Sequence, residues 1–189
     1  MIGTLGHAAY SQRRLQSMIL QSEPLNIIHA ADAQTLRQSA LDKIEHTQDE
    51  AFICLTLNEI NALLVAFSSQ HKNTVIGCRM ESEGNHLKIF LSLKDPQSGK
   101  YINLVGAGIV SVSDGILSLQ LRDGRIGKLE FRDRHFRSVQ KGIEAILNER
   151  AKDFLSVIKS AKYEEGVFRA VLEKNENKHV KSVDKSFLR

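Results

Sequence analysis

A β-hairpin between residues 100 and 128 constrains this chain more than any other feature of its sequence. Leucines at positions 117, 119 and 121 alternate with polar residues, and this period of two predicts a strand with one buried face. Asp114 and Gly115 separate this strand from a preceding apolar run. Asp-Gly at such a point is typical of a two-residue turn, in which both central residues take positive φ. The sequence therefore predicts an antiparallel strand pair at the centre of the fold.

Two glycines lie on one face of the first strand of this hairpin. Gly106 and Gly108 are two residues apart, so both project from the same side. Glycine weakens a strand interior, and it is expected where another group comes close or where the strand coils. We expect a helix that crosses the sheet to be the close neighbour.

The remaining patterns predict an α+β fold. A second hairpin is predicted over residues 75–94, and helices over 33–46, 57–67 and 133–160, the last with a break at 148–151. A final strand, 167–173, follows a turn at residues 165–166. This order predicts a twisted antiparallel sheet of four or more strands with helices packed on one face. We divide the chain into an N-terminal arm and helix (1–50), a core domain (51–173) and a disordered basic tail (174–189).

The start of the helix at residue 57 has a complete capping signature. Thr56 is followed three residues later by Glu59, the spacing of a capping box, in which each residue bonds the backbone N–H of the other. Leu55 and Ile60 flank the box as a hydrophobic staple. Asn61 lies beside the apolar stripe of this helix, and a partly buried Asn needs hydrogen-bond partners. We expect Asn61 to hold the helix on a strand edge rather than to bind a ligand.

Composition places the chain among ordinary soluble proteins. Its 189 residues are 42% hydrophobic and 25% charged, with a formal net charge of +4, which permits contact with an anionic surface without requiring it. There is neither an apolar run of about 20 residues, the length needed to cross a bilayer, nor the pattern of a signal peptide. An anchor upstream of Met1 stays open.

Motifs that carry catalysis or bind metals are absent from the sequence. The seven histidines are scattered, and no phosphate loop, nucleophile elbow or HExxH motif occurs. We therefore expect no enzymatic activity, no cofactor and no metal site. Cys54 and Cys78 are interpreted as two buried free thiols, with a single disulfide as the alternative.

The densest local charge is a basic cluster at the start of the long C-terminal helix. Arg132, Arg134 and Arg137 are the candidate ligand-binding residues, because they could meet the phosphates of nucleic acid or of lipid headgroups. The alternative is a solvated helix start with Asp133 as its N-cap. Because no aromatic residues are interleaved with basic ones in a base-stacking pattern, we do not expect a nucleic-acid partner.

Three short motifs carry a resemblance to a known group of proteins. They are LT-x-x-E-[IL]-N-A-L at 55–63, Y-x-N-x-x-G at 101–106 and DG-x-L at 114–117. In these motifs the chain resembles a family of short bacterial proteins of unknown function, in which a membrane anchor precedes an extracytoplasmic domain. More distantly it resembles the tubular lipid-binding superfamily. The resemblance implies an extracytoplasmic location, tethering to a membrane and no catalytic residues.

These observations lead to a non-enzymatic, envelope-facing binding or scaffold module, with a protein or a lipid as partner. A gap between the helices at 57–67 and 136–147 would leave an apolar groove for an acyl chain, with the three arginines at its mouth. Full coverage of the sheet by the helices would instead indicate a scaffold. A protein-protein interaction subunit of an assembly is the alternative function.

Overall fold

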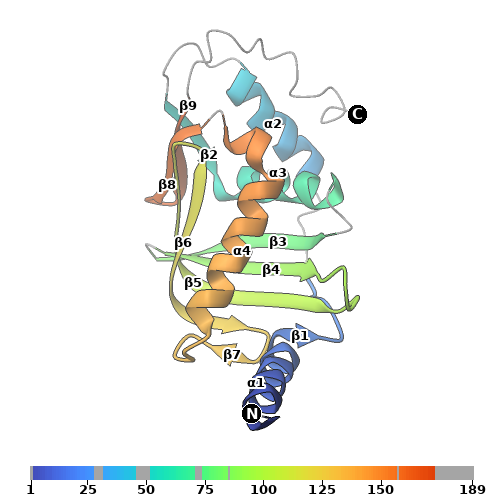
Figure 1. The fold of residues 1–189 in the computed structure, drawn as a ribbon. Coiled ribbons are helices and arrows are strands. Elements are labelled where there is room, and N and C mark those ends of the chain that lie inside the picture. Colours follow the sequence, from blue (N-terminus) through green and yellow to red (C-terminus); the bar gives the residue numbers. More distant parts are fainter. Residues whose placement is uncertain are drawn as a thin grey trace.

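The fold is an α+β arrangement of one bent antiparallel sheet and helices packed against it, as the sequence predicts (Figure 1). The computed structural model describes residues 2–27, 32–45, 52–70, 74–84, 86–156 and 158–172. Its helices are α1 (Ile2–Ile19), α2 (Ala33–Glu45), α3 (Leu57–Gln70), α4 (Phe136–Arg150) and α5 (Lys152–Leu155). Its strands are β1 (Leu20–Gln21), β2 (Phe52–Thr56), β3 (Val75–Glu83), β4 (His86–Lys94), β5 (Tyr101–Ser113), β6 (Ile116–Ile126), β7 (Leu129–Glu130), β8 (Ile158–Glu164) and β9 (Val167–Leu172).

Strand β5 is the centre of the sheet. Along one edge of β5, two different strands pair with its two ends, and the sheet divides there into two wings. The first part of β5, residues 101–108, pairs with β4, and its last part, residues 111–113, pairs with β8. Strand β6 overlaps both parts, pairing with residues 104–113, so β4 and β8 share one edge of β5 and β6 takes the other. One wing therefore consists of β4 and β3, and the second of β8, β9 and β2. In Figure 1 the two wings run in clearly different directions.

The two glycines of β5 lie where this strand bends. The pairing with β6 shifts between Ala107 and Gly108, so that Arg122 has no partner across the ladder; this is a β-bulge, which bends a strand and increases its twist. A Cβ on Gly108 would lie 2.3 Å from the Gln120 carbonyl oxygen, and one on Gly106 would lie 2.9 Å from the Asp123 carbonyl oxygen. The prediction that a helix is the close neighbour is wrong, because the backbone of the adjacent strand takes this place.

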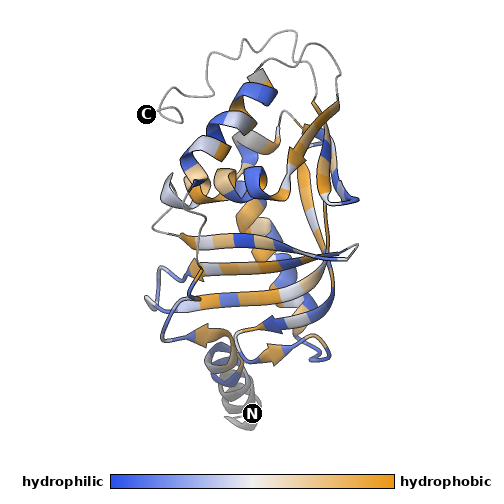
Figure 2. Cartoon of the chain, turned by 180° about the vertical axis from the view of Figure 1, so that it is seen from behind, coloured by the Kyte–Doolittle hydropathy of each residue, from blue (hydrophilic) through white to orange (hydrophobic). Residues whose placement is uncertain are grey.

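The apolar face of the sheet is buried. Leu117 is half-buried, and six further residues of this face are at most 4% exposed: Leu87, Ile89, Leu91, Leu93, Leu119 and Leu121. They form one cluster with Phe136 and Ile143 of α4, and the apolar stripe of α3 packs against that cluster. Figure 2 shows the apolar stretches running along β3, β4 and β5. Burial to this degree leaves these leucines inside a filled core rather than lining an open groove.

Both predicted hairpins are confirmed, and so is the turn near the C-terminus. Asp114 and Gly115 have φ of 48° and 74°, the positive values that a type I′ turn requires. Strands β3 and β4 pair directly as predicted. Glu165 and Gly166 also have positive φ and connect β8 to β9.

The predicted helix over 133–160 is wrong at both ends. Helix α4 begins at Phe136, with His135 at the N-cap and no side-chain cap bond. Asp133 is therefore not the cap; its carboxylate accepts a hydrogen bond from the backbone N–H of His135, 3.0 Å away, within a turn. The break at Ala151 is present, but only the four-residue α5 follows, and Ile158 begins strand β8. Pairing with β9 and β5 decides the conformation of this segment.

Cys54 differs from its predicted burial. Both cysteines are free thiols, but Cys54 is exposed whereas Cys78 is buried. Strand β2 lies at the border of the sheet, and its burial alternates so that Ile53 and Leu55 face the core. Cys54 therefore projects outward. Burial raises the pKa of the Cys78 thiol to about 12. Residues 173–189, which include the predicted tail, lie outside the described residues.

Candidate functional site

The capping box of α3 forms and extends to a second helix. The Glu59 carboxylate accepts from the Thr56 backbone N–H at 2.9 Å, and the Glu59 N–H donates to the Thr56 hydroxyl at 3.3 Å. Glu59 is only 3% exposed, and its carboxylate also accepts hydrogen bonds from Lys43 and Ser39 of α2. Burial raises the pKa of Glu59, but the hydrogen bonds from Lys43, Thr56 and Ser39 outweigh burial and hold it at about 2. The predicted box is confirmed, and the structure adds that Glu59 ties α2 to α3.

Asn61 holds α3 on the edge of the sheet, as the sequence predicts. Its side-chain amide donates to the Met80 carbonyl oxygen at 2.8 Å and accepts from the Met80 N–H at 2.8 Å. Met80 belongs to β3, the last strand of its wing, so this amide takes the place of a neighbouring strand. The role of Asn61 is structural.

Helix α4 covers the edge of β6 in a similar way, with three side chains that sequence reasoning did not single out. Asn148 bonds both backbone groups of Leu117, accepting at 2.8 Å and donating at 2.9 Å. At Leu119 the two bonds are divided: Glu144 accepts from the N–H at 2.7 Å, and Gln140 donates to the carbonyl at 2.6 Å. These residues recur every four positions, which places them on one side of the helix.

The three predicted arginines lie together at one end of the molecule, and all are exposed. Arg137 lies over the Phe131 ring, 5.0 Å from its centroid, and Arg134 donates to the His135 ring nitrogen at 3.0 Å. Within the described part of the chain, none of Arg132, Arg134 and Arg137 forms an ion pair. Their positive charge is therefore available to a ligand.

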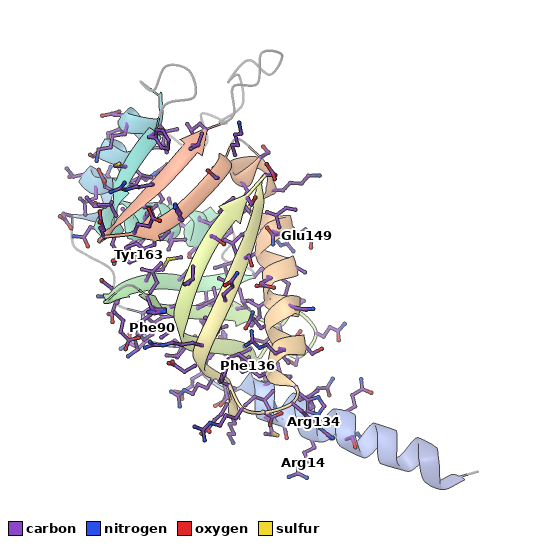
Figure 3. The ribbon with its side chains drawn as sticks, turned by 90° about the vertical axis from the view of Figure 1, so that its left-hand side faces the viewer. Arg14, Phe90, Arg134, Phe136, Glu149 and Tyr163 are labelled. Carbon is purple, nitrogen blue, oxygen red and sulfur yellow. The ribbon has the colours of Figure 1, made fainter. Side chains whose placement is uncertain are left out.

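Helix α1 brings two more arginines to the same end. Its C-terminus is attached to the turn between β6 and β7, where the Lys128 N–H donates to the Met18 carbonyl at 2.6 Å. Arg13 and Arg14, about one turn earlier in α1, are exposed. Figure 3 shows Arg14 and Arg134 where α1 leaves the body of the protein. We name the five residues Arg13, Arg14, Arg132, Arg134 and Arg137 the basic end.

A cavity of about 310 Å³ lies beside the basic end. It is partly open to solvent, and it is lined by Gln21 and Leu25, by Asn103 and Val105 of β5, and by residues in and beside the turn from β6 to β7. Its charged lining residues are Arg125, Lys128 and Glu130. Sequence reasoning missed this cavity, because its walls come from three segments that are far apart in the chain.

The described residues offer neither a metal site nor a membrane-spanning helix as a further candidate. No group of three or more His, Cys, Asp or Glu side chains among these residues could hold a metal ion. No helix in the same ranges has both the length and the apolar character needed to cross a bilayer. The basic end and its cavity are therefore the candidate site.

Comparison with protein-family models, with curated proteins and with solved structures found no match to this chain. The resemblance that the three sequence motifs suggest therefore stays a prediction. The structure assigns those motifs to caps, strands and turns: 55–63 to the start of α3, 101–106 to β5, and 114–117 to the hairpin that follows.

Proposed function

We propose that this protein is a non-enzymatic binding or scaffold module whose basic end faces an anionic membrane surface. The observation that carries the proposal is the convergence of five exposed arginines, free of ion pairs within the described residues, at the base of α1. The extracytoplasmic location and the membrane tether that the motif resemblance implies belong to the same proposal, since a tether at the N-terminus would hold this end near a membrane.

The strength of the electrostatic attraction agrees with reversible contact between the basic end and a membrane surface. A basic residue near an anionic bilayer contributes about 1 kcal/mol, and the attraction decays within about 8 Å at physiological salt. Five such residues at one end are enough for measurable but salt-sensitive binding. The buried leucine face supports contact with headgroups rather than uptake of an acyl chain, because six of its residues are at most 4% exposed.

Vesicle sedimentation tests the proposal. We expect the protein to pellet with vesicles of phosphatidylglycerol and phosphatidylcholine, to remain in solution with phosphatidylcholine alone, and to be released by 0.5 M salt, at which the screening length is about 4 Å. The variant Arg132→Gln/Arg134→Gln/Arg137→Gln should bind at least about tenfold more weakly, since three contacts of about 1 kcal/mol are lost.

The matched control removes the same number of charges elsewhere. Arg150, Lys152 and Lys159 are exposed and lie at or beyond the opposite end of α4, so their replacement by Gln should leave vesicle binding nearly unchanged. Equal binding to neutral vesicles, or equal loss in both triple variants, would contradict an oriented basic end.

The second candidate, an interaction subunit of an assembly, has an observation of its own. Phe52 is 77% exposed on β2, the outermost strand of its wing, and an exposed strand edge can accept a strand from a partner. Sedimentation equilibrium of the wild type and of Phe52→Lys measures this. Association that weakens in the variant supports the assembly, and a monomer at every concentration argues against self-association through β2.

A further inference from the structure

We infer that the cavity beside the basic end binds a phosphate ester through Arg125 and Lys128, an inference that rests on the proposed function and names its ligand. The cavity, about 310 Å³, is at the lower end of the size range of small-molecule sites. One phosphate with a small polar substituent fits this volume, whereas a phospholipid with its acyl chains does not. The ligand is therefore a headgroup or the corresponding free ester.

Hydrogen bonds within the protein fix the walls of the cavity in advance. Asn103 accepts from the hydroxyl of the fully buried Ser92 at 2.8 Å and donates to the Glu23 carbonyl at 2.9 Å. The Gly127 N–H donates to the Asn103 carbonyl at 2.7 Å. Gly127 has a φ of +60°, and a Cβ there would lie 2.4 Å from the carbonyl oxygens at the end of α1. A site with such fixed walls loses little conformational entropy when it binds a ligand.

The positive charges on the cavity are not used by the protein itself. Within the described residues, neither Arg125 nor Lys128 makes an ion pair or a side-chain hydrogen bond. The backbone N–H groups of Gly127 and Lys128 are already bonded to Asn103 and Met18, so a ligand would be held by the two side chains. A planar guanidinium binds a phosphate with two parallel hydrogen bonds, and an ammonium adds a point charge.

A single carboxylate opposite the cations restricts the substituent. Glu130 lies across the ladder from Arg125 and also lines the cavity. A carboxylate repels a second anionic group but accepts a hydrogen bond from a hydroxyl or an ammonium group. Val105 and Leu25 supply an apolar side. The chemistry therefore favours a phosphate that carries a short hydroxylated or aminated chain, such as glycerol phosphate or phosphoethanolamine, over inorganic phosphate.

Nuclear magnetic resonance titration of the ¹⁵N-labelled full chain tests this site. Glycerol phosphate, phosphoethanolamine and inorganic phosphate are added separately, and the amide signals of Gly127, Lys128 and Asn103 are followed. We expect saturable shifts with the two esters and at least about fivefold weaker binding of inorganic phosphate. Arg125→Gln/Lys128→Gln should weaken ester binding by at least about tenfold, because the variant loses both charge-assisted contacts with the phosphate. Both residues are exposed, so the variant is expected to fold.

The titration tests the cavity and the vesicle experiment tests the membrane contact, so either proposal can fail without the other. Arg132→Gln/Arg134→Gln/Arg137→Gln should keep ester binding, because those residues lie outside the cavity. If the esters shift these amides and vesicles do not bind, the site holds a free ester and the membrane proposal fails alone. If vesicles bind but no ester gives saturable shifts, or if the shifts survive Arg125→Gln/Lys128→Gln, the cavity is not the site and the inference is overturned.

Discussion

Helices α3 and α4 both dock on a strand edge through side-chain amides, but they are fixed in different ways. Helix α3 has a complete capping box at its N-terminus and bonds a strand edge through Asn61, which contacts Met80. Helix α4 has no side-chain cap, and instead it bonds β6 at Leu117 and Leu119. One helix is fixed at its start, and the other is fixed along its length.

This difference shows that a helix can bond a strand edge through its side chains without having a side-chain cap at its own N-terminus. An edge strand exposes unpaired N–H and C=O groups that invite association with other strands, and a bidentate amide satisfies both groups of one residue. At Leu119 two side chains share this task, and the buried side-chain oxygen of Gln140 has no partner among the described residues. We therefore expect the contacts of α4 to be individually weaker but mutually supportive.

The largest effect is expected from Gly108→Val, which would change the position of the edge that α4 covers. The added Cβ would meet the Gln120 carbonyl oxygen at 2.3 Å, and a strand backbone cannot move aside as a flexible side chain can. We expect the free energy of unfolding, measured by urea denaturation, to fall by about 3 kcal/mol, which is the upper end of ordinary overpacking. A stability equal to that of wild type would mean that the bulge in β6 is not needed.

Asn61→Leu should have the next largest effect, because among the described residues Asn61 is the one side chain of α3 that bonds both backbone groups of a strand residue. The substitution leaves the N–H and C=O of Met80 without a partner, and Met80 is only 8% exposed. Each unsatisfied buried group costs about 1–3 kcal/mol, and partial access to water at the edge reduces this, so we expect about 2–3 kcal/mol in urea denaturation. Hydrogen exchange at the Met80 amide should accelerate, with the Leu119 amide as an internal control.

Asn148→Leu removes the same bidentate contact from α4 and should cost less, about 1–2 kcal/mol. Gln140 and Glu144 still hold Leu119, and Phe136 remains buried in the core. Circular dichroism melts of this variant and of Asn61→Leu give a direct comparison. A larger loss from Asn148→Leu than from Asn61→Leu would reverse our ranking of the two helices.

The two helices also show what a sequence can predict. The capping box of Thr56 and Glu59 spans four residues, so its chemistry can be read locally. The contacts of Gln140, Glu144 and Asn148 cannot be read in this way, because a polar stripe on a helix resembles a solvent-facing surface until the opposing strand edge is known. The same limit hid the cavity and the contacts of Glu59 with α2.

Errors in the prediction follow the same division between local and distant interactions. The helical pattern at 133–160 carries local propensity, but pairing with β5 and β9 makes a strand from Ile158 onward. The glycines at 106 and 108 correctly marked a close approach, but the sequence does not identify the approaching group. The arginines at 132, 134 and 137 could be found as a cluster, whereas Arg13 and Arg14 join them only through the attachment of α1.

The smallest effect is expected from Glu59→Gln, and its value lies in its pH dependence. The pKa of Glu59 falls from 4.5 to about 2 on folding, so the ionised carboxylate stabilises the folded state above about pH 4.5, and this contribution is lost as the pH falls towards 2. Gln keeps one acceptor oxygen for Thr56 but loses the charge that attracts Lys43, which is 42% exposed. A pKa that falls from 4.5 to about 2 corresponds to about 3 kcal/mol at pH 7. Because Lys43 can reach water and is partly screened, we discount most of this value and expect a cost of about 1 kcal/mol at pH 7.

Urea denaturation of wild type and Glu59→Gln at pH 7, 4 and 3 provides the measurement. The difference in stability should narrow as the pH falls, since wild type loses a contribution that the variant lacks. Asp95→Asn is the matched control: hydrogen bonds with Ser98 also lower the pKa of Asp95, but they do so in an exposed loop. A difference between wild type and Glu59→Gln that stays constant with pH would show that the carboxylate caps α3 only as a hydrogen-bond acceptor. In that case the charge of Glu59 would contribute nothing to holding α3.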